Sequence, residues 1–145
     1  MVIIVTGTPG TGKTTYAKKL AEEKSLVYVD VTLLIKENKL FEKYDKKMDC
    51  VVVDIKKLNK ELIKFIKKND KVVIDSHLSH YLPPRYVDLC IVTKCDLKTL
   101  EKRLKKRKYS KAKIRENLDA EIFDTCRIEA LEAGHKVKVV WTDKK

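Results

Sequence analysis

The residues with the clearest chemical meaning form a glycine-rich segment near the start of the chain. Residues 7–14 read Gly-Thr-Pro-Gly-Thr-Gly-Lys-Thr, which fits the pattern G-x-x-x-x-G-K-S/T. In such a loop the glycines let backbone N–H groups approach phosphate oxygens without a Cβ in the way. Lys13 should reach the outer phosphates, and the Thr14 hydroxyl should take one position on Mg²⁺. The pattern therefore predicts a nucleoside triphosphate site, with Gly10 and Gly12 among the residues in contact.

The elements around this segment are those that the chemistry requires. Residues 2–5 are a β-branched run typical of a buried parallel strand, and a helix is expected from about Lys13 to Glu23. The start of that helix would direct its positive dipole end toward the phosphates. Thr15 is either a further phosphate contact or an ordinary residue of the first helical turn. A glycine-rich turn that fits by chance is the alternative, which the order of strand, loop and helix disfavours.

A second candidate for chemistry is the acidic residue that ends a later apolar run. Residues 71–75 predict another buried strand, and Asp75 closes it. Beside a phosphate loop, a carboxylate in this place holds Mg²⁺ directly or through a water, as a Walker B residue does. An aspartate that caps the strand-to-loop turn is the alternative. His77 could orient a water or a phosphate, or be an ordinary loop histidine.

The strand and helix patterns alternate along the whole chain. A polar, lysine-rich stretch at 30–49 shows helical periodicity around Leu33, Leu34 and Ile35. The other expected strands are 26–29, 88–92 and 137–141, and the other expected helices are 55–67, 97–106 and 111–133. Right-handed crossovers place such a chain in a parallel sheet covered on both faces, with the nucleotide at the carboxyl ends of the strands.

Length and charge limit the possible partners. The 145 residues suit one domain, and 33 Lys and Arg against 21 Asp and Glu give a formal net charge of +12. A positive field attracts polyanions, a requirement that nucleotides alone would satisfy. Nucleic-acid contact is an open alternative, because most basic runs are solvated helix faces. The runs are Lys18-Lys19, Lys56-Lys57, Lys67-Lys68 and Lys105-Lys106-Arg107-Lys108.

The cysteines and the apolar segments bear on location. Cys50, Cys90, Cys95 and Cys126 form no C-x-x-C pair and lie in or beside apolar segments, so we expect reduced core residues in an intracellular, cytoplasmic protein. The first apolar run leads directly into the glycine-rich loop, unlike a signal peptide. No segment approaches the roughly 20 apolar residues of a membrane helix.

Three segments together resemble one known family. They are GTPGTGKTT at 7–15, Asp75-Ser76-His77, and the region from Arg107-Lys108-Tyr109 through Ala120-Glu121-Ile122. In this combination the chain resembles the atypical adenylate kinases of archaea and of the eukaryotic nucleus, the isoenzyme 6 type, also known as coilin-interacting nuclear ATPases and ribosome-assembly ATPases. The resemblance covers nearly the whole chain. It implies a three-layer P-loop NTPase fold of the nucleoside-monophosphate-kinase variant, with a monophosphate-binding insert at about 30–53 and a lid at about 106–116.

The lid implied by the resemblance contains residues suited to phosphoryl transfer. Arg103 and Arg107 lie four residues apart and so on one helical face, from which guanidinium groups can neutralise charge on the phosphoryl group. The resemblance makes Arg107 an ATP contact, although either arginine could be a solvated surface group. Tyr109 is expected to pack at the lid hinge. Lys108 replaces the glycine of the usual R-G-Y signature, which should make the hinge less permissive.

Three further residues concern the substrate side. Lys36 stands where family members often carry an arginine, so a point charge replaces a bidentate phosphate clamp. Arg85 either faces the transferred phosphate, as in related kinases, or is a loop arginine. Asp54 is expected to cap the helix that begins at Ile55, with a substrate-side role as the alternative.

The resemblance implies transfer of the γ-phosphoryl group from MgATP to AMP, together with ATPase activity. Catalysis would rest on Lys13, Asp75, His77 and Arg107, with Mg²⁺ held by Thr14 and Asp75. The rival function is an ATP-hydrolysing assembly factor for the small ribosomal subunit, in which His77 positions water and a small-subunit ribosomal protein and pre-rRNA are partners. A kinase for another nucleoside monophosphate or a small metabolite is the third alternative. The location would be the archaeal cytoplasm, or the nucleus in a eukaryote, with no membrane partner.

Overall fold

Five strands form one parallel sheet in the middle of the molecule. In spatial order they are β2 (Val27–Asp30), β5 (Val72–Asp75), β1 (Val2–Thr6), β6 (Leu89–Lys94) and β7 (Val137–Trp141). All neighbouring pairs are parallel, and Val5 lies level with Asp75 on one side and Ile91 on the other. The computed structural model describes residues 1–45 and 50–143, with the backbone alone at 41–45 and 50–51. The expected α/β fold is confirmed.

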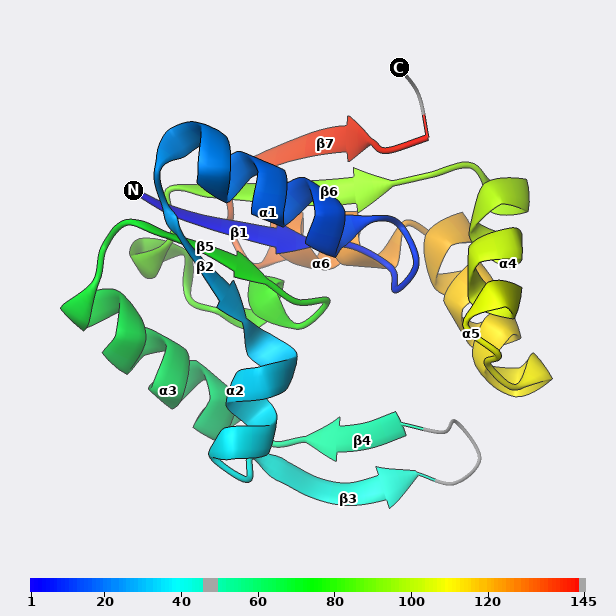
Figure 1. The fold of residues 1–145 in the computed structure, drawn as a ribbon, viewed down its shortest axis with the longest axis horizontal. Coiled ribbons are helices and arrows are strands. Elements are labelled where there is room, and N and C mark those ends of the chain that lie inside the picture. The colour runs from blue at the N-terminus through cyan, green and yellow to red at the C-terminus, as the bar shows by residue number, and fades with distance from the viewer. Residues whose placement is uncertain (46–49, 144–145) are drawn as a thin grey trace.

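Alternate residues of the central strands face two different helical layers. Ile3 and Val5 pack with Ala17 and Leu20 of α1 (Lys13–Lys24) on one face of the sheet. On the other face, Ile4 and its neighbours pack against α3 (Ile55–Lys68) and α6 (Thr125–Glu132). Figure 1 shows α1 on one side of the strands and α6 on the other. These central strands are apolar along their whole length and buried on both faces of the sheet, as the sequence predicted.

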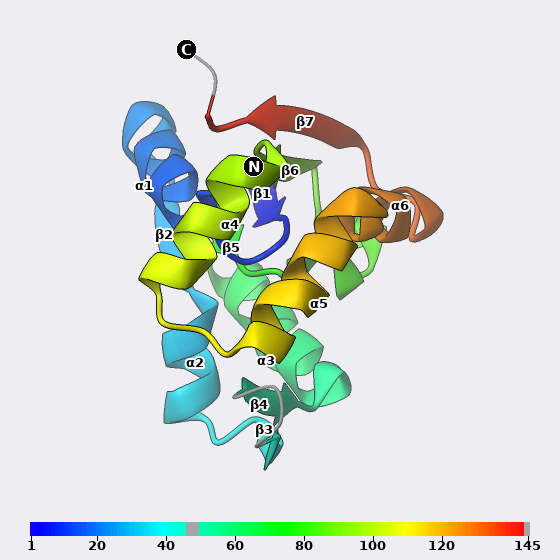
Figure 2. The ribbon, with the colours of Figure 1, turned by 90° about the vertical axis from the view of Figure 1, so that its right-hand side faces the viewer.

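Two protrusions extend beyond the carboxyl ends of the strands. One follows β2 and consists of α2 (Val31–Glu37) and the antiparallel pair β3 (Phe41–Asp45) and β4 (Cys50–Val53). The other follows β6 and consists of α4 (Leu97–Lys106) and α5 (Lys111–Ile122). The α4–α5 hairpin has a small core of its own, in which Leu100 and Leu104 meet Ile114 and Leu118. Figures 1 and 2 show the α4–α5 hairpin on the side toward which β1 and β6 point, and α2, β3 and β4 below the sheet.

The structure adds one pair of strands that the sequence did not predict and corrects one expectation about local structure. The helical periodicity around Leu33, Leu34 and Ile35 corresponds to α2, which ends at Glu37, and β3 then pairs with β4. The single helix expected at 111–133 is two helices, because Asp124 adopts a left-handed conformation with φ 57°. The Asp124 carboxylate binds Lys94 Nζ at 2.8 Å and also contacts Arg127. This tertiary ion pair holds the break that local helix propensity did not predict.

Several smaller features follow the sequence closely. Asp54 caps α3 by accepting a hydrogen bond from the Lys57 amide at 3.1 Å. Cys90 and Cys95 are buried and unpaired, Cys126 is partly buried, and Cys50 lies in β4, where side chains are not described. Between β5 and β6 lie two short 3₁₀ helices, η1 (Ser79–Tyr81) and η2 (Pro84–Tyr86). Within the described ranges, no helix is long and apolar enough to cross a bilayer.

Candidate active site

The phosphate loop takes the shape that its glycines permit. Gly12 caps α1 in a left-handed conformation (φ 86°), and Lys13 begins the helix. Gly10 has φ 94°, and a Cβ there would lie 2.9 Å from the Leu100 side chain of α4. The loop is therefore packed closely against α4, the first helix of the α4–α5 hairpin. Any larger residue at Gly10 would meet both backbone strain and a steric clash.

Threonine hydroxyls fix the loop from within. Thr11 Oγ1 donates to the Thr8 carbonyl oxygen at 2.6 Å and lies 2.8 Å from Thr93 Oγ1 on β6. Thr142 Oγ1, just after β7, donates to the Thr11 carbonyl oxygen at 2.5 Å. Thr8, Thr11 and Thr93 are almost fully buried. Satisfied hydrogen bonds to buried groups hold the loop in place without any ligand.

Lys13 lies folded back over the loop. Its Nζ donates to the Thr8 carbonyl oxygen at 3.3 Å. The surrounding protein desolvates the ammonium, although the side chain keeps some contact with solvent, and this lowers the pKa of Lys13 to about 8. The negative charge of Asp75 opposes that shift. A cation held in this way gains most when phosphate oxygens replace the missing water.

This pKa makes a prediction about nucleotide affinity. Bound phosphates stabilise the charged ammonium, so the pKa of Lys13 must be higher in the complex than the value of about 8 in the free protein. ATP affinity should therefore be flat below about pH 8 and weaken by up to about tenfold per unit above it. Titration calorimetry between pH 7.5 and 9.5, in two buffers of different ionisation enthalpy, should also show proton uptake on binding. An unchanged pH slope in Lys13→Ala would contradict this assignment.

Asp75 lies beside the loop, where β5 ends. Two hydroxyl groups donate to its Oδ2 atom, Thr14 Oγ1 at 2.7 Å and the Tyr28 hydroxyl at 2.6 Å. The Asp75 residue is largely buried, and within the described parts of the chain no donor bonds its Oδ1 atom. Burial and the bond to Asp75 raise the pKa of Tyr28, which keeps its proton for donation. The expected strand-end carboxylate thus has an orienting partner that the sequence did not reveal.

The sequence did not predict the contact between Tyr28 and Asp75, because tyrosine is a common residue type in strands. Tyr28 lies in β2, next to β5 in the sheet, and is level with Val73. A tyrosine in an apolar run is typical of a half-buried strand position. Only the order of strands, which brings β2 beside β5, shows that its hydroxyl reaches Asp75.

Two histidines follow β5, and they differ in environment. His77 is open to solvent, yet the protein around its ring removes enough water, together with the charge of Lys13, to lower the pKa of His77 to about 4. His77 is therefore a neutral imidazole at neutral pH, able to donate or accept one hydrogen bond. His80 is buried, with Nδ1 2.7 Å from the Thr6 hydroxyl. His80 thus supports Thr6 at the end of β1, while His77 follows the end of β5.

A hollow of about 700 Å³ adjoins the loop on the side of α4 and β7. Arg103 reaches from α4 to the Gly10 carbonyl oxygen at 3.2 Å. Arg107 is exposed at the end of α4, with Nη1 3.4 Å from the Tyr109 hydroxyl, so Tyr109 does pack at the turn of the hairpin. The lining comprises Gly10, Gly12, Thr15, Tyr16, Lys19, Arg103, Lys106, Arg107, Val140, Trp141 and Thr142. Tyr16, Trp141 and Thr142 are additions that no sequence motif indicated.

The remaining candidates lie elsewhere. Lys36 is exposed in the last turn of α2. Arg85 stacks on Tyr86, with 4.8 Å from the guanidinium carbon to the ring centroid, and precedes β6 at the edge of the sheet opposite the loop. Of the two alternatives for Arg85, the structure therefore supports the loop arginine. Lys108 has φ 60°, a conformation that glycine adopts at lower cost, in agreement with a stiffened hinge.

Comparison with known proteins gives a consistent family. The family model described as "AAA domain" matches residues 3–124. A Pyrococcus furiosus protein named "Putative adenylate kinase" is 43% identical over 148 residues, covering 100% of this chain and 77% of that protein. The "Adenylate kinase isoenzyme 6 homolog" of Dictyostelium discoideum is 38% identical over 128 residues, covering 88% and 73%.

Solved structures agree on the fold. The structure of shikimate kinase from Bacteroides thetaiotaomicron aligns with a TM-score of 0.68 at 15% identity, over 99% of this chain and 87% of that one. At that identity the match is evidence only for the kinase P-loop fold. The sequence relatives make the chain a phosphotransferase of the nucleotide-kinase type. The chain therefore belongs to the family of the archaeal adenylate kinases and their eukaryotic isoenzyme 6 homologues.

Proposed function

We propose that this protein transfers the γ-phosphoryl group of ATP to AMP, giving two ADP, and that it also hydrolyses ATP slowly. The observation that supports this most directly is the convergence of Lys13, Thr14 and Asp75 at one edge of the sheet, between two protrusions. A phosphoryl donor and an acceptor must both reach that edge. The relatives' names support adenine nucleotides as the pair.

The proposed reaction needs positioning rather than a protein nucleophile. An oxygen of the AMP phosphate attacks the γ-phosphorus, and the bond from that phosphorus to the β–γ bridging oxygen breaks, which releases ADP. Lys13 and the loop amides stabilise the β- and γ-phosphates, with Gly10, Gly12 and Thr15 beside them. Arg107 approaches from the lid at about 106–116 and neutralises developing charge, with Arg103 behind it. The insert at about 30–53 holds AMP, and the hollow takes the nucleoside of ATP.

The residues present fit a Mg²⁺ ion. Mg²⁺ prefers oxygen ligands and is held by one or two protein groups, together with phosphates and waters. The Thr14 hydroxyl and the Asp75 carboxylate, 2.7 Å apart, supply such oxygens at the end of β5. The part of the chain that the structure describes contains no group of three or more His, Cys, Asp and Glu residues able to hold a metal, and a phosphate-bound Mg²⁺ requires none. When bound, the ion would offset phosphate charge.

Product analysis tests the proposal. ADP and free phosphate should be followed separately with MgATP, in the presence and absence of AMP, and with Lys13→Ala as the control. AMP-dependent ADP formation with little phosphate supports the transferase. Phosphate release that is indifferent to AMP would replace it with an ATPase, for which the neutral His77 would orient water. Other nucleoside monophosphates in place of AMP would identify a different acceptor.

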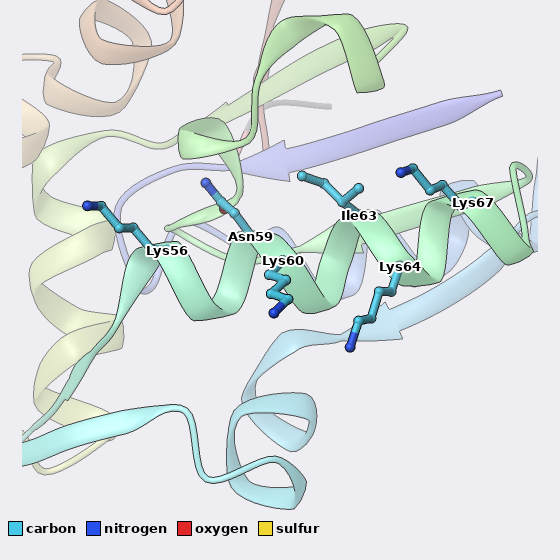
Figure 3. Close-up of a pocket in the computed structure, with 6 residues that line it drawn as sticks. All are labelled: Lys56, Asn59, Lys60, Ile63, Lys64 and Lys67. Atoms are coloured by element: carbon cyan, nitrogen blue, oxygen red, sulfur yellow. The ribbon is translucent and has the colours of Figure 1, made fainter.

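A second function, contact with RNA, is favoured by the outer face of α3. Four lysines, Asn59 and Ile63 line a shallow groove of about 520 Å³, and no carboxylate is in its lining. Figure 3 shows Lys60 and Lys64 projecting to one side of the helix and Lys56 and Lys67 to the other. At 1.5 Å per residue, the row from Lys56 to Lys67 spans about 16 Å. That length matches a few consecutive phosphates of an RNA strand.

The lysines of this α3 groove are poorly neutralised. Helix α3 carries six lysines and one acidic residue, Glu61, which lies 3.5 Å from Lys64. Like charges four residues apart destabilise a helix by about 0.2–0.5 kcal/mol per pair. A polyanion would relieve that repulsion, and the net charge of +12 would attract one. We propose RNA of the small ribosomal subunit as this polyanion, in the role of an assembly factor.

Charge reversal should separate this RNA contact from catalysis. Lys60→Glu with Lys64→Glu should weaken RNA binding and reduce the slope of log K against log salt by about 2, since two phosphate contacts are lost. Phosphoryl transfer should be unchanged, because neither residue lines the nucleotide hollow. Lys136→Glu with Lys138→Glu gives the same change of charge at β7 and should leave RNA binding nearly intact. Equal weakening by both pairs would show a nonspecific field rather than a site on α3.

A further inference from the structure

A carboxylate buried beneath the α4–α5 hairpin has no role in the chemistry described so far. In the fully described helix α5, Glu121 alone is buried, with 8% of its surface exposed. Burying a charged group is costly unless it is paired and hydrogen-bonded. A helix could satisfy its packing here with an apolar residue at lower cost. The partners of Glu121 therefore indicate what the carboxylate does.

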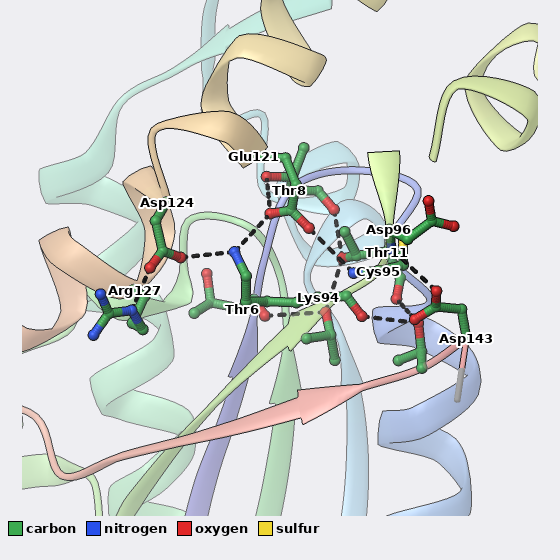
Figure 4. Close-up of polar contacts among 12 residues, drawn as sticks. Thr6, Thr8, Thr11, Lys94, Cys95, Asp96, Glu121, Asp124, Arg127 and Asp143 are labelled. Atoms are coloured by element: carbon green, nitrogen blue, oxygen red, sulfur yellow. Dashed lines mark hydrogen bonds and ion pairs between the residues drawn. The ribbon is translucent and has the colours of Figure 1, made fainter. Parts of the chain in front are cut away.

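Those partners come from the phosphate loop and the end of β6. Thr8 Oγ1 donates to Glu121 Oε1 at 3.3 Å, and the backbone amide of Cys95 donates to Oε2 at 3.2 Å. Lys94 Nζ lies 3.3 Å from Oε1 and 2.8 Å from the carboxylate of Asp124, where α5 ends. Figure 4 shows the Lys94 ammonium between the two acidic side chains, with Thr8 beside Glu121. The Glu121 carboxylate thus joins α5 both to the phosphate loop and to the end of β6.

Thr8 carries this connection to the reacting end of the loop. Its carbonyl oxygen accepts the hydrogen bonds of Lys13 Nζ and Thr11 Oγ1. A shift of Glu121 that releases the Thr8 hydroxyl would remove one of the hydrogen bonds that position the residue whose carbonyl oxygen Lys13 contacts. The path from α5 to Lys13 is therefore two residues long and consists of hydrogen bonds between largely buried groups.

The other helix of the hairpin meets the same loop. Leu100 of α4 closes over Gly10, and Arg103 bonds the Gly10 carbonyl oxygen. Both helices that flank the turn at 107–110 are thus in contact with the phosphate loop, α4 by packing and α5 through Glu121. Movement of the hairpin cannot leave the loop unaffected.

We propose that Glu121 is a positioning residue that couples the α4–α5 hairpin to the phosphate loop through Thr8, so that the hairpin and Lys13 respond together to ATP. This inference depends on the proposed function only because it treats the α4–α5 hairpin as the lid over ATP. ATP binding itself, which needs no acceptor, is the readout. A failure of AMP transfer would therefore leave the inference testable.

The experiment compares Glu121→Gln, Thr8→Val and the double variant. Each single variant should raise the Kd for MgATP by about tenfold, because Thr8→Val removes the buried hydrogen bond and Glu121→Gln removes the charge that strengthens it. The double variant should lose less than about twofold beyond either single one, because both changes remove the same connection. Asp119→Asn, on the exposed side of α5 where Asp119 pairs with Arg115, is the matched control and should bind ATP normally.

Hydrogen exchange distinguishes coupling from mere support of the fold. In the unaltered protein, ATP should slow amide exchange in both the loop and residues 106–118. In Glu121→Gln that has kept its fold, as judged by Tm and circular dichroism, ATP should still protect the loop but no longer residues 106–118. Additive losses in the double variant, an unchanged Kd, or protection of 106–118 as strong as before would each overturn the proposal.

Discussion

Replacing Lys13 with alanine should lower kcat/KM for ATP on the order of 10³-fold, the cost of removing a preorganised group that stabilises transition-state charge. Lys13 is the cation that begins α1, and its ammonium is already held over the loop by the Thr8 carbonyl oxygen. Lys19 and Lys106 instead lie in the wall of the neighbouring hollow. The loss should appear in kcat more than in KM.

The same substitution should not destabilise the fold. Burial lowers the pKa of Lys13 to about 8 in the folded chain, below the ordinary value of 10.5. Below pH 8 the charged lysine therefore costs stability, and that cost disappears as the pH rises from 8 toward 10.5. Lys13→Ala should have an equal or higher Tm at pH 7, measured by calorimetry. Lys24→Ala, at the exposed end of the same helix, is the control and should keep full activity. A variant that unfolds, or one that retains a tenth of the activity, would contradict the assignment.

Replacing Asp75 with asparagine should reduce kcat on the order of 10²-fold or more, in line with other losses of electrostatic stabilisation at an active site. Asparagine keeps the shape, and its amide oxygen can still accept hydrogen bonds from the hydroxyl groups. It removes the negative charge that favours Mg²⁺ and that opposes the fall in the pKa of Lys13. The loss should be seen with MgATP in initial-rate measurements. ATP binding in the presence of a chelator should change little.

Tyr28→Phe provides the matched comparison for Asp75. It removes only the hydroxyl that donates to Asp75 Oδ2 at 2.6 Å. A single hydrogen bond is worth about 0.5–1.5 kcal/mol, so the rate should fall by less than about tenfold. If Tyr28→Phe proved as damaging as Asp75→Asn, the tyrosine would have a direct part in the reaction. If Asp75→Asn were as active as Tyr28→Phe, Asp75 would be a structural cap and not a metal ligand.

The parts of the site that the sequence predicted are those encoded by short stretches. The loop at 7–14 and the strand ending at Asp75 can each be predicted from local residue types. The parallel sheet then brings them together. The groups that escaped prediction depend on long-range contact. Tyr28 resembles a strand residue until β2 is known to lie beside β5. Glu121 belongs to a segment, 113–122, that the sequence assigns to helix packing, and its contact with Thr8 is known only from the way α5 packs on the loop.

The errors in secondary structure have the same origin. The break between α5 and α6 depends on Lys94, thirty residues before Asp124, and no local signal marks it. The pairing of β3 with β4 is likewise decided by contact between two strands rather than by the charged, lysine-rich residues of the first. The sequence could not decide between the two alternatives for Arg85, because its place depends on the direction in which the chain enters β6. Strand order and burial are properties of the whole chain.

The four buried threonines of the phosphate site have a consequence for where motion must occur. Thr6, Thr8, Thr11 and Thr93 tie the loop to β6, to η1 and to α5 before any nucleotide arrives. Little conformational entropy remains in the loop for ATP to remove, so its ordering cannot slow the cycle. The slow events of each turnover should instead be the opening and closing of the two protrusions. The phosphate loop then keeps its overall shape through the cycle, while the hydrogen bond from Thr8 to Glu121 links its position to that of the moving α4–α5 hairpin.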